Sequence, residues 1–342
     1  MANITRARSP CRLPIGGGFT DLKEYYEKYG GAVIETALGI HTYATIMERK
    51  DKVIKVQNDD LNVNERGTLT DLSGIRPFYS AVIRYFSPKA GFELIMNSDV
   101  GYGSGLGSSS ASLVSIIGAF DRWLGKNLSQ YEIAELAHRL ERTELDIYAG
   151  KQDPYATAFG GFNYIEFSKS GIVVNSMKID DSILRELQFR TIIADTGVTK
   201  TASTTIKDLI QKINAGDATV LEHLAYIKRS ANEIKNKIYK GDLDDMHILI
   251  NEEWEHKRAL VEGMSNKQLD DLFKFGLNNG AKAGRLLGSG GGGHMLFIVN
   301  EEGRHKLVKA LSGRGLKVYS PEFVLGGLCV WRTQGASSGK IR

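Results

Sequence analysis

The residues with the clearest potential for chemistry form a turn rich in glycine and serine at residues 101–110, which reads GYGSGLGSSS. A strand-like sequence, FELIMNSDV, leads into the turn, and apolar residues at helical spacing begin after Ser108. The first amides of a helix have no partner within it and carry partial positive charge, so such a turn can bind a phosphate. Taken alone, the stretch fits a flexible surface turn equally well.

The spacing of these glycines excludes two common phosphate-binding loops. The chain contains no GxxxxGK[ST] segment, and its glycines follow GxGxGxG rather than GxGxxG. The seven histidines show neither HxxxH nor HExxH spacing, so the sequence offers no histidine metal cluster. An anion-binding turn of another kind is therefore the functional interpretation to test.

Four charged residues each allow a catalytic role and a purely local one. Asp153 precedes Pro154, and Asp21 precedes a helix expected to begin at Leu22, so each aspartate also fits a helix cap. Arg12 has apolar neighbours, and because an unpaired buried charge is costly we expect a partner, namely Asp153. Glu141 lies beside the apolar face of a helix, with a solvated helix surface as the alternative.

The elements that must position these residues change in kind along the chain. The first half is rich in strand-forming residues and contains expected helices at 74–86, from Ser108, and from Ser129, where Ser129 and Glu132 have capping-box spacing. GFNYIEF and GIVVNSMKI predict a hairpin, and GLCVWR a closing strand. Further helices are expected at 201–213, 218–238, 242–263, 266–278 and 304–312. We predict an α+β protein with domains at 1–190 and 191–342.

The bulk composition is that of an ordinary globular protein. Of 342 residues, 42% are hydrophobic and 25% charged, and the net charge of +4 is spread without a basic block. We therefore expect no nucleic-acid partner. The start of the chain lacks a signal-peptide core, and no apolar run reaches the roughly 20 residues of a membrane span. With only Cys11 and Cys329 as cysteines, we expect a soluble cytoplasmic protein, and a homodimer is one possible assembly.

Four segments occur in a fixed order along the chain: SPCRLPIGGGFTD, GYGSGLGSSS, GKQDPYATAFGGF and GSGGGG. Together they resemble the signature set of the GHMP kinase family over nearly the whole chain. The resemblance implies phosphoryl transfer from ATP to a hydroxyl. It also implies an N-terminal domain like the second domain of ribosomal protein S5 and a ferredoxin-like C-terminal domain. One departure is Gly101, where the family loop usually has a proline.

The resemblance implies roles for individual residues. Asp153 matches the family's catalytic aspartate, which accepts the proton of the attacking hydroxyl or orients it, and Arg12 matches an arginine near the reacting groups. The residues implied to bind ATP are Gly103, Gly105, Leu106, Gly107, Ser108, Ser109 and Ser110. Those implied to bind the substrate are Gly17, Gly18, Thr20, Asp21, Gly291 and Gly292. Those implied to bind Mg²⁺ are Ser109 and Glu141, with Glu144 as the alternative to Glu141.

The acceptor is implied by two longer segments, residues 9–38 and 150–167. They resemble family members that phosphorylate the anomeric hydroxyl of a heptose 7-phosphate, on the way to nucleotide-activated heptose and surface polysaccharide. Fucokinase-type enzymes are almost as similar, and the Gly-Gly-Phe-Thr-Asp at 17–21 differs from the Glu-His-Thr-Asp of galactokinases. A non-catalytic sugar and ATP sensor on the same fold remains an alternative. Candidate cations for a distal phosphate are Arg8, Lys23, Lys200 and Arg285, with Lys282 a further cation that can reach an anion.

Overall fold

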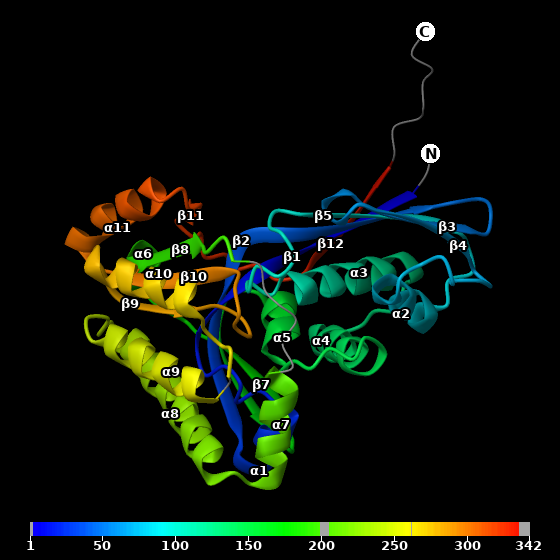
Figure 1. Ribbon diagram of the computed structural model, residues 1–342. Coiled ribbons are helices and arrows are strands. Elements are labelled where there is room, and N and C mark those ends of the chain that lie inside the picture. Colours follow the sequence, from blue (N-terminus) through cyan, green and yellow to red (C-terminus); the bar gives the residue numbers. More distant parts are fainter. Residues whose placement is uncertain (1–2, 199–204, 261, 335–342) are drawn as a thin grey trace.

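The computed structural model describes residues 3–198, 205–260 and 262–334 and arranges them in two sheets flanked by helices (Figure 1). The larger sheet has eight strands, six of them in the order β12-β1-β2-β5-β3-β4, while β6 pairs with β2 and β7 pairs with β6. Its strands are β1 (Asn3–Gly16), β2 (Gly31–Glu48), β3 (Val53–Asn58), β4 (Val63–Thr68), β5 (Phe92–Ser98), β6 (Phe162–Ser168), β7 (Gly171–Ser176) and β12 (Cys329–Gln334).

The two longest strands, β1 and β2, pair antiparallel and form the spine of this sheet. One half of β2 pairs with β6 and the other half with β5. The register of β1 shifts between Pro10 and Arg12 and again between Pro14 and Gly16. A bulge bends a strand and redirects its side chains, so β1 is bent close to Arg12.

The first half of the chain also supplies helices beside the larger sheet. They are α1 (Lys23–Tyr29), η1 (Asp59–Leu61), α2 (Pro77–Phe86), α3 (Ser108–Leu124), α4 (Gln130–Arg139), η2 (Leu140–Glu144) and α5 (Gln152–Phe159). Of these, α3 and α5 contact β1 and β2 directly. Helix α3 packs along β1 and β2 with Leu113, Ile117 and Phe120 fully buried, which confirms the apolar spacing read from the sequence. The predicted capping box of Ser129 and Glu132 is present at the start of α4.

The second sheet is antiparallel and has the strand order β11-β8-β10-β9. Its strands are β8 (Thr191–Asp195), β9 (Ala281–Leu286), β10 (His294–Val299) and β11 (Val318–Tyr319). The helices of this half are α6 (Asp181–Arg190), α7 (Thr205–Ala215), α8 (Ala218–Lys240), α9 (Met246–Leu260), α10 (Lys267–Asn278) and α11 (Glu301–Gly313). The helix expected at 242–263 is shorter than predicted, and residues 201–204 of the first expected helix lie outside the described residues. Across the described ranges, no helix has an apolar stretch long enough to cross a bilayer.

The two halves of the chain share a hydrophobic core. Leu13 and Ile34 of the larger sheet pack in one cluster with Ile234 of α8, Ile250 of α9 and Leu296 of β10. The second sheet begins at β8, next to the predicted boundary, but β12 returns to pair with β1 (Figure 1). The α+β class is confirmed, while the domain limits 1–190 and 191–342 stay a prediction.

Candidate active site

A cavity of about 600 Å³ lies where the turn before α3, the start of α5 and the loop after β9 meet. Both halves of the chain contribute to its wall. Among the lining residues are many that the sequence singles out: Arg12, Gly18, Asp21, Gly103, Gly105, Gly107, Ser108, Ser109, Ser110, Glu141, Asp153 and Arg285. The fold therefore brings together residues that lie more than 270 positions apart in the chain.

The glycine and serine turn forms one wall of this cavity. Helix α3 begins at Ser108, as predicted, and Gly107 is its N-cap with φ 73°. This φ is one that other residues rarely adopt, so the position favours glycine for its conformation, and a Cβ there would also be in tight contact, 3.1 Å from Cγ of Arg12. Leu106 does not line the cavity; its side chain is fully buried and its carbonyl accepts a hydrogen bond from the Arg12 amide at 2.9 Å.

The glycine-rich loop between β9 and β10 packs directly on the turn before α3. A Cβ on Gly105 would lie 2.7 Å from the Leu287 carbonyl oxygen, and His294 donates its amide to the Ser104 carbonyl at 3.0 Å. Gly288 and Ser289 line the cavity. The sequence placed the substrate contact at Gly291 and Gly292 instead, and neither of these lines it; the Gly291 amide bonds the Met264 carbonyl.

Arg12 and Asp153 form a two-pronged ion pair. Nε and Nη2 of Arg12 each donate to Asp153 at 2.8 Å, and Nη1 donates to the Gly105 carbonyl at 2.6 Å. The expected pairing is thus confirmed. The alternative that Asp153 caps a helix opening at Pro154 is wrong, because α5 begins at Gln152 with Lys151 as its N-cap and no capping side chain. The Arg12 side chain is 3% exposed and that of Asp153 25%, so the carboxylate is the member of the pair more open to a ligand.

Asp21 is held against the start of α5. Its Oδ2 accepts a hydrogen bond from the Gln152 amide at 2.9 Å, while Oδ1 is buried with no partner among the described residues. The cap alternative is wrong here too, since α1 has Leu22 as its N-cap. Burial raises the pKa of Asp21 to about 6, and the nearby charge of Asp153 adds to the effect. An unpaired carboxylate oxygen in a cavity wall is suited to accept hydrogen bonds from a ligand.

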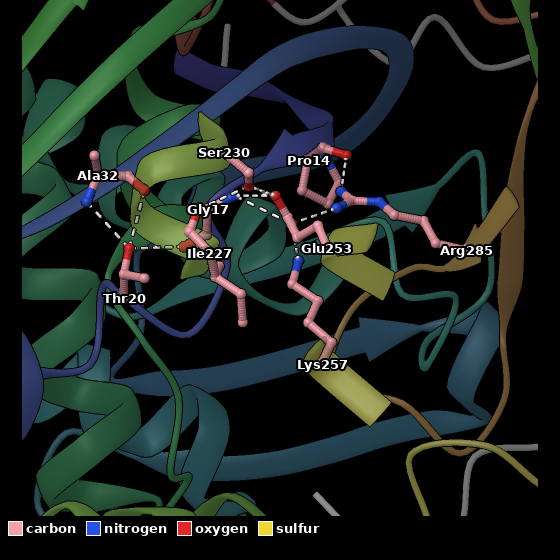
Figure 2. Close-up of polar contacts among 9 residues, drawn as sticks. All are labelled: Pro14, Gly17, Thr20, Ala32, Ile227, Ser230, Glu253, Lys257 and Arg285. Carbon is pink, nitrogen blue, oxygen red and sulfur yellow. Dashed lines mark hydrogen bonds and ion pairs between the residues drawn. The ribbon is translucent and has the colours of Figure 1, made fainter. Parts of the chain in front are cut away.

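Thr20 shapes the loop that carries Asp21. Its hydroxyl lies 2.7 Å from the Gly17 carbonyl oxygen and 2.9 Å from that of Ala32, and it accepts a bond from the Ala32 amide (Figure 2). The side chain is fully buried, and neither Thr20 nor Gly17 lines the cavity. Of the predicted substrate residues in this loop, Gly18 and Asp21 are the two that reach the cavity.

A buried charge cluster around Glu253 of α9 was not found from the sequence. Oε1 of Glu253 lies 2.7 Å from Nζ of Lys257 and 2.9 Å from Nη1 of Arg285, and Oε2 accepts bonds from Ser230 and the Gly17 amide (Figure 2). Burial opposes ionisation, but the two cations hold the pKa of Glu253 below its usual value. Glu253 and Lys257 stand one helical turn apart, a spacing that usually marks a solvated pair, so the sequence gives no sign of burial.

Glu141 is buried in η2 behind the start of α3. Ser110 donates to its Oε1 at 2.8 Å, and Oε2 has no partner among the described residues. Burial raises the pKa of Glu141 to about 8. The alternative, Glu144, instead pairs with Arg84 at 3.3 Å and does not line the cavity. Ser109 does line it.

The cations proposed from sequence for a distal phosphate are scattered. Arg8, Lys23 and Lys282 do not line the cavity, and Lys200 lies outside the described residues. Arg285 does line it but is almost fully buried, with one terminal nitrogen on Glu253 and the other on the Pro14 carbonyl. Among these candidates, therefore, only Arg285 reaches the cavity, and its terminal nitrogens are engaged.

Fold and cavity together fit a phosphotransferase, because a helix N-terminus shares one cavity with a carboxylate paired with an arginine. The profile described as "GHMP kinases N terminal domain" matches residues 76–161, and the one described as "GHMP kinases C terminal" matches residues 234–315. A curated relative, the D-glycero-alpha-D-manno-heptose 7-phosphate kinase of Campylobacter jejuni, is 34% identical over 96% of this chain and 98% of its own. The chain belongs to the GHMP kinase family, and the two-domain fold expected from the resemblance is confirmed.

Solved structures agree with this assignment. A D-glycero-D-manno-heptose 1-phosphate kinase from Bacteroides thetaiotaomicron superimposes with a TM-score of 0.79 at 28% identity, covering 97% of this chain and all of that one. A Lactococcus lactis galactokinase complexed with galactose also reaches 0.79, over 95% of each chain, but at 18% identity it shares the fold alone. As a member of the family the protein is a kinase that uses ATP and an alcohol acceptor.

Proposed function

We propose that the protein transfers the γ-phosphoryl group of ATP to the anomeric hydroxyl of D-glycero-D-manno-heptose 7-phosphate, giving the 1,7-bisphosphate. The observation that carries the proposal is the Arg12–Asp153 ion pair, which lies in one cavity with the N-terminus of α3. The name and full-length similarity of the Campylobacter jejuni relative support the choice of sugar. The product would feed nucleotide-activated heptose and surface polysaccharide synthesis.

The donor side of the cavity is the turn before α3. The amides at the start of α3 and the hydroxyl of Ser109 would donate to the phosphates of ATP. Ser108 and Ser110 also line the cavity, but their hydroxyls donate to the Gly101 carbonyl and to Glu141. The loop from Leu287 to Gly293 packs on this turn from the second sheet, so it would fix the turn's shape around the nucleotide. The predicted contacts at Gly103, Gly105 and Gly107 fit this placement.

Magnesium fits the residues proposed for it. The buried Oε2 of Glu141 lacks a partner among the described residues, and Ser109 lines the same cavity. The described residues contain no group of three His, Cys, Asp or Glu side chains able to hold a metal. Mg²⁺ in kinases needs no such group, because it keeps waters and binds substrate phosphates beside one or two side chains. When bound, it would neutralise charge on the phosphates.

On the acceptor side, Asp153 would take the proton of the attacking hydroxyl. Arg12 stabilises its carboxylate form and offsets negative charge on the moving phosphoryl group. An anomeric hydroxyl is more acidic than an ordinary alcohol, so a carboxylate is an adequate base. Asp21, with a free oxygen in the wall, would orient hydroxyls of the sugar.

The intact Arg12–Asp153 pair argues against a non-catalytic sensor, and Gly18 and Phe19, which stand where galactokinases have Glu and His, argue against a galactokinase. The test is a coupled assay of ADP release with heptose 7-phosphate, unphosphorylated heptose, fucose and galactose, with the product's phosphate located by NMR. We expect the highest kcat/KM for heptose 7-phosphate and a new phosphate on the anomeric carbon. Turnover of another sugar alone would refute the proposed substrate. A homodimer and a cytoplasmic location stay predictions from the sequence.

A further inference from the structure

We infer that Lys257, with the backbone amides of Gly18 and Phe19, forms the subsite that binds the distal phosphate of the sugar. The inference rests on the proposed function, because it concerns the acceptor proposed there. Nothing in the sequence pointed to Lys257, and the cations suggested from sequence are elsewhere or already paired. Its subsite is defined by position, by charge and by unpaired backbone donors.

Lys257 lies at the acceptor side of the cavity. A Cβ on Gly18 would lie 3.1 Å from Nζ of Lys257 and 3.6 Å from Nε2 of Gln152, so both polar groups border the space above Gly18. Successive contacts lead there from the phosphate loop: Gly105 to Arg12, Arg12 to Asp153, and the neighbouring Gln152 to Gly18. Lys257 thus borders the space beside Gly18 and Gln152, the residue before Asp153, and we place the distal phosphate there, on the acceptor side.

The charges leave Lys257 with capacity for an anion. Lys257 and Arg285 share a single carboxylate at ion-pair distance, that of Glu253, and Asp21 is a further acid whose charge acts on Lys257. An ammonium has three donors, and Glu253 is the acid partner that the described contacts give Lys257. Arg12, by contrast, uses its donors on Asp153 and Gly105. Among the buried cations that line the cavity in the described part of the chain, Arg285 has only its Nε without a partner, whereas Lys257 has an ammonium whose ion pair is the one with Glu253.

The loop beside Lys257 offers backbone donors. Gly18 and Phe19 both line the cavity, and the amide of neither donates a hydrogen bond to any described residue. Phe19 has φ 75°, a left-handed backbone conformation that residues other than glycine rarely adopt. Such conformations are often found at functional sites. Turns with unpaired amides are suited to bind phosphate groups.

The protonation behaviour of Lys257 agrees with such a role. Burial, and next the charge of Arg285, lower the pKa of Lys257 to about 8, against the opposing effects of Glu253 and Asp21. Without an anion nearby, burial and Arg285 therefore disfavour the charged form of Lys257. A phosphate dianion beside it would favour the charged form. Lys207 also lines the cavity, but it is exposed and lies over the Tyr148 ring at 5.4 Å, so it is the comparison cation.

The test compares Lys257→Met with Lys207→Met in steady-state kinetics on heptose 7-phosphate and on unphosphorylated heptose. Because a charged hydrogen bond contributes more than a neutral one, we expect Lys257→Met to raise KM for heptose 7-phosphate roughly 10- to 100-fold. The same variant should change kcat/KM for unphosphorylated heptose less than about threefold and leave KM for ATP unchanged. Lys207→Met should behave like the wild type.

Gly18→Ala serves as a second variant that keeps the Glu253 cluster intact. Its methyl group would intrude 3.1 Å from Nζ of Lys257, so it should raise KM for heptose 7-phosphate selectively. Equal losses on both sugars, or a selective loss in Lys207→Met alone, would overturn the subsite. If the wild type uses heptose 7-phosphate but both variants match it, the subsite is wrong and the proposed function stands. If the wild type uses only unphosphorylated sugars, both proposals fail.

Discussion

The carboxylate of Asp153 accepts two parallel hydrogen bonds of 2.8 Å from the guanidinium of Arg12, 141 residues earlier in the chain. The pair ties the start of α5 to the bent part of β1, and the third arm of Arg12 reaches the turn before α3 through Gly105. Acceptor-side and donor-side elements therefore meet at one side chain. Bidentate pairs of this kind fix orientation as well as charge.

Asp153→Asn should nearly abolish turnover while the protein still binds ATP. The amide keeps the size of the side chain but cannot take a proton, and removal of a general base costs about 10²- to 10⁴-fold in rate. The measurements are kcat from ADP release and ATP affinity by calorimetry. Asp181→Asn, whose side chain is 77% exposed and pairs with Arg185, is the matched control and should behave like the wild type. Normal turnover in Asp153→Asn would remove this residue from the mechanism.

Arg12→Lys should lower kcat even though it conserves the charge. Lysine cannot make the two parallel bonds to Asp153 together with the bond to Gly105, so the carboxylate and the turn lose their common anchor. We expect a loss of about 100-fold in kcat, the size seen when one positioned donor is removed. Arg6→Lys, at an exposed position of the same strand, is the control. A kcat for Arg12→Lys within a factor of two of the wild type would show that charge alone is sufficient.

Gly150→Ala should disrupt the acceptor side through Asp21. A Cβ on Gly150 would lie 1.9 Å from Oδ2 of Asp21, which is impossible without displacing the carboxylate from the Gln152 amide. Because small misplacements of a positioned group cost about 100-fold, kcat/KM for the sugar should fall by that order while KM for ATP changes little. Gly313→Ala, at the end of α11, is the control, since its added Cβ would meet no neighbouring group within 4 Å. Full activity in Gly150→Ala would mean that Asp21 is not held as described.

Much of this arrangement could be predicted from local signals. The turn at 101–110 and the capping box at Ser129 are local patterns, and both lie where expected. The pairing of Arg12 followed from the cost of an unpaired charge among apolar neighbours. The turn and the capping box depend on residues close in sequence, and the pairing of Arg12 depends on the high free-energy cost of an unpaired buried charge.

Other features depend on packing that no local pattern encodes. Asp21 had the signature of a helix cap, but its carboxylate bonds the amide of Gln152, 131 residues away. Glu253 and Lys257 look like a surface pair, and they become buried only because α9 packs against the loop at Gly17. In the run of glycines after Leu287, composition could not tell which ones reach the cavity.

Asp21→Asn should stabilise the protein at neutral pH while impairing its activity. The pKa of Asp21 is about 6 in the folded state and 3.8 as its ordinary value, so between these values the folded state holds more protons than the unfolded state. The free energy of unfolding therefore falls as pH rises from about 4 to 6, by on the order of 3 kcal/mol from this group. In the variant this fall should disappear, as urea unfolding at several pH values would reveal. If the free energy of unfolding depended on pH in the same way in the variant and the wild type, the raised pKa of Asp21 would be contradicted.

Glu253→Gln should destabilise the fold far more than a surface change of the same kind. The variant leaves Lys257 and Arg285 buried beside a neutral amide, and breaking a buried ion pair costs about 3–5 kcal/mol. It also weakens the bond that holds the Gly17 amide, so the loop carrying Asp21 should loosen and KM for the sugar should rise. Urea unfolding measures the loss of stability, and kinetics at a temperature where the variant is folded measures the rise in KM.

Glu255→Gln is the control, on the same helix with a 63% exposed side chain, and it should change the free energy of unfolding by less than about 0.5 kcal/mol. Equal stabilities of the two variants would show that the Glu253 cluster is as dispensable as a surface pair.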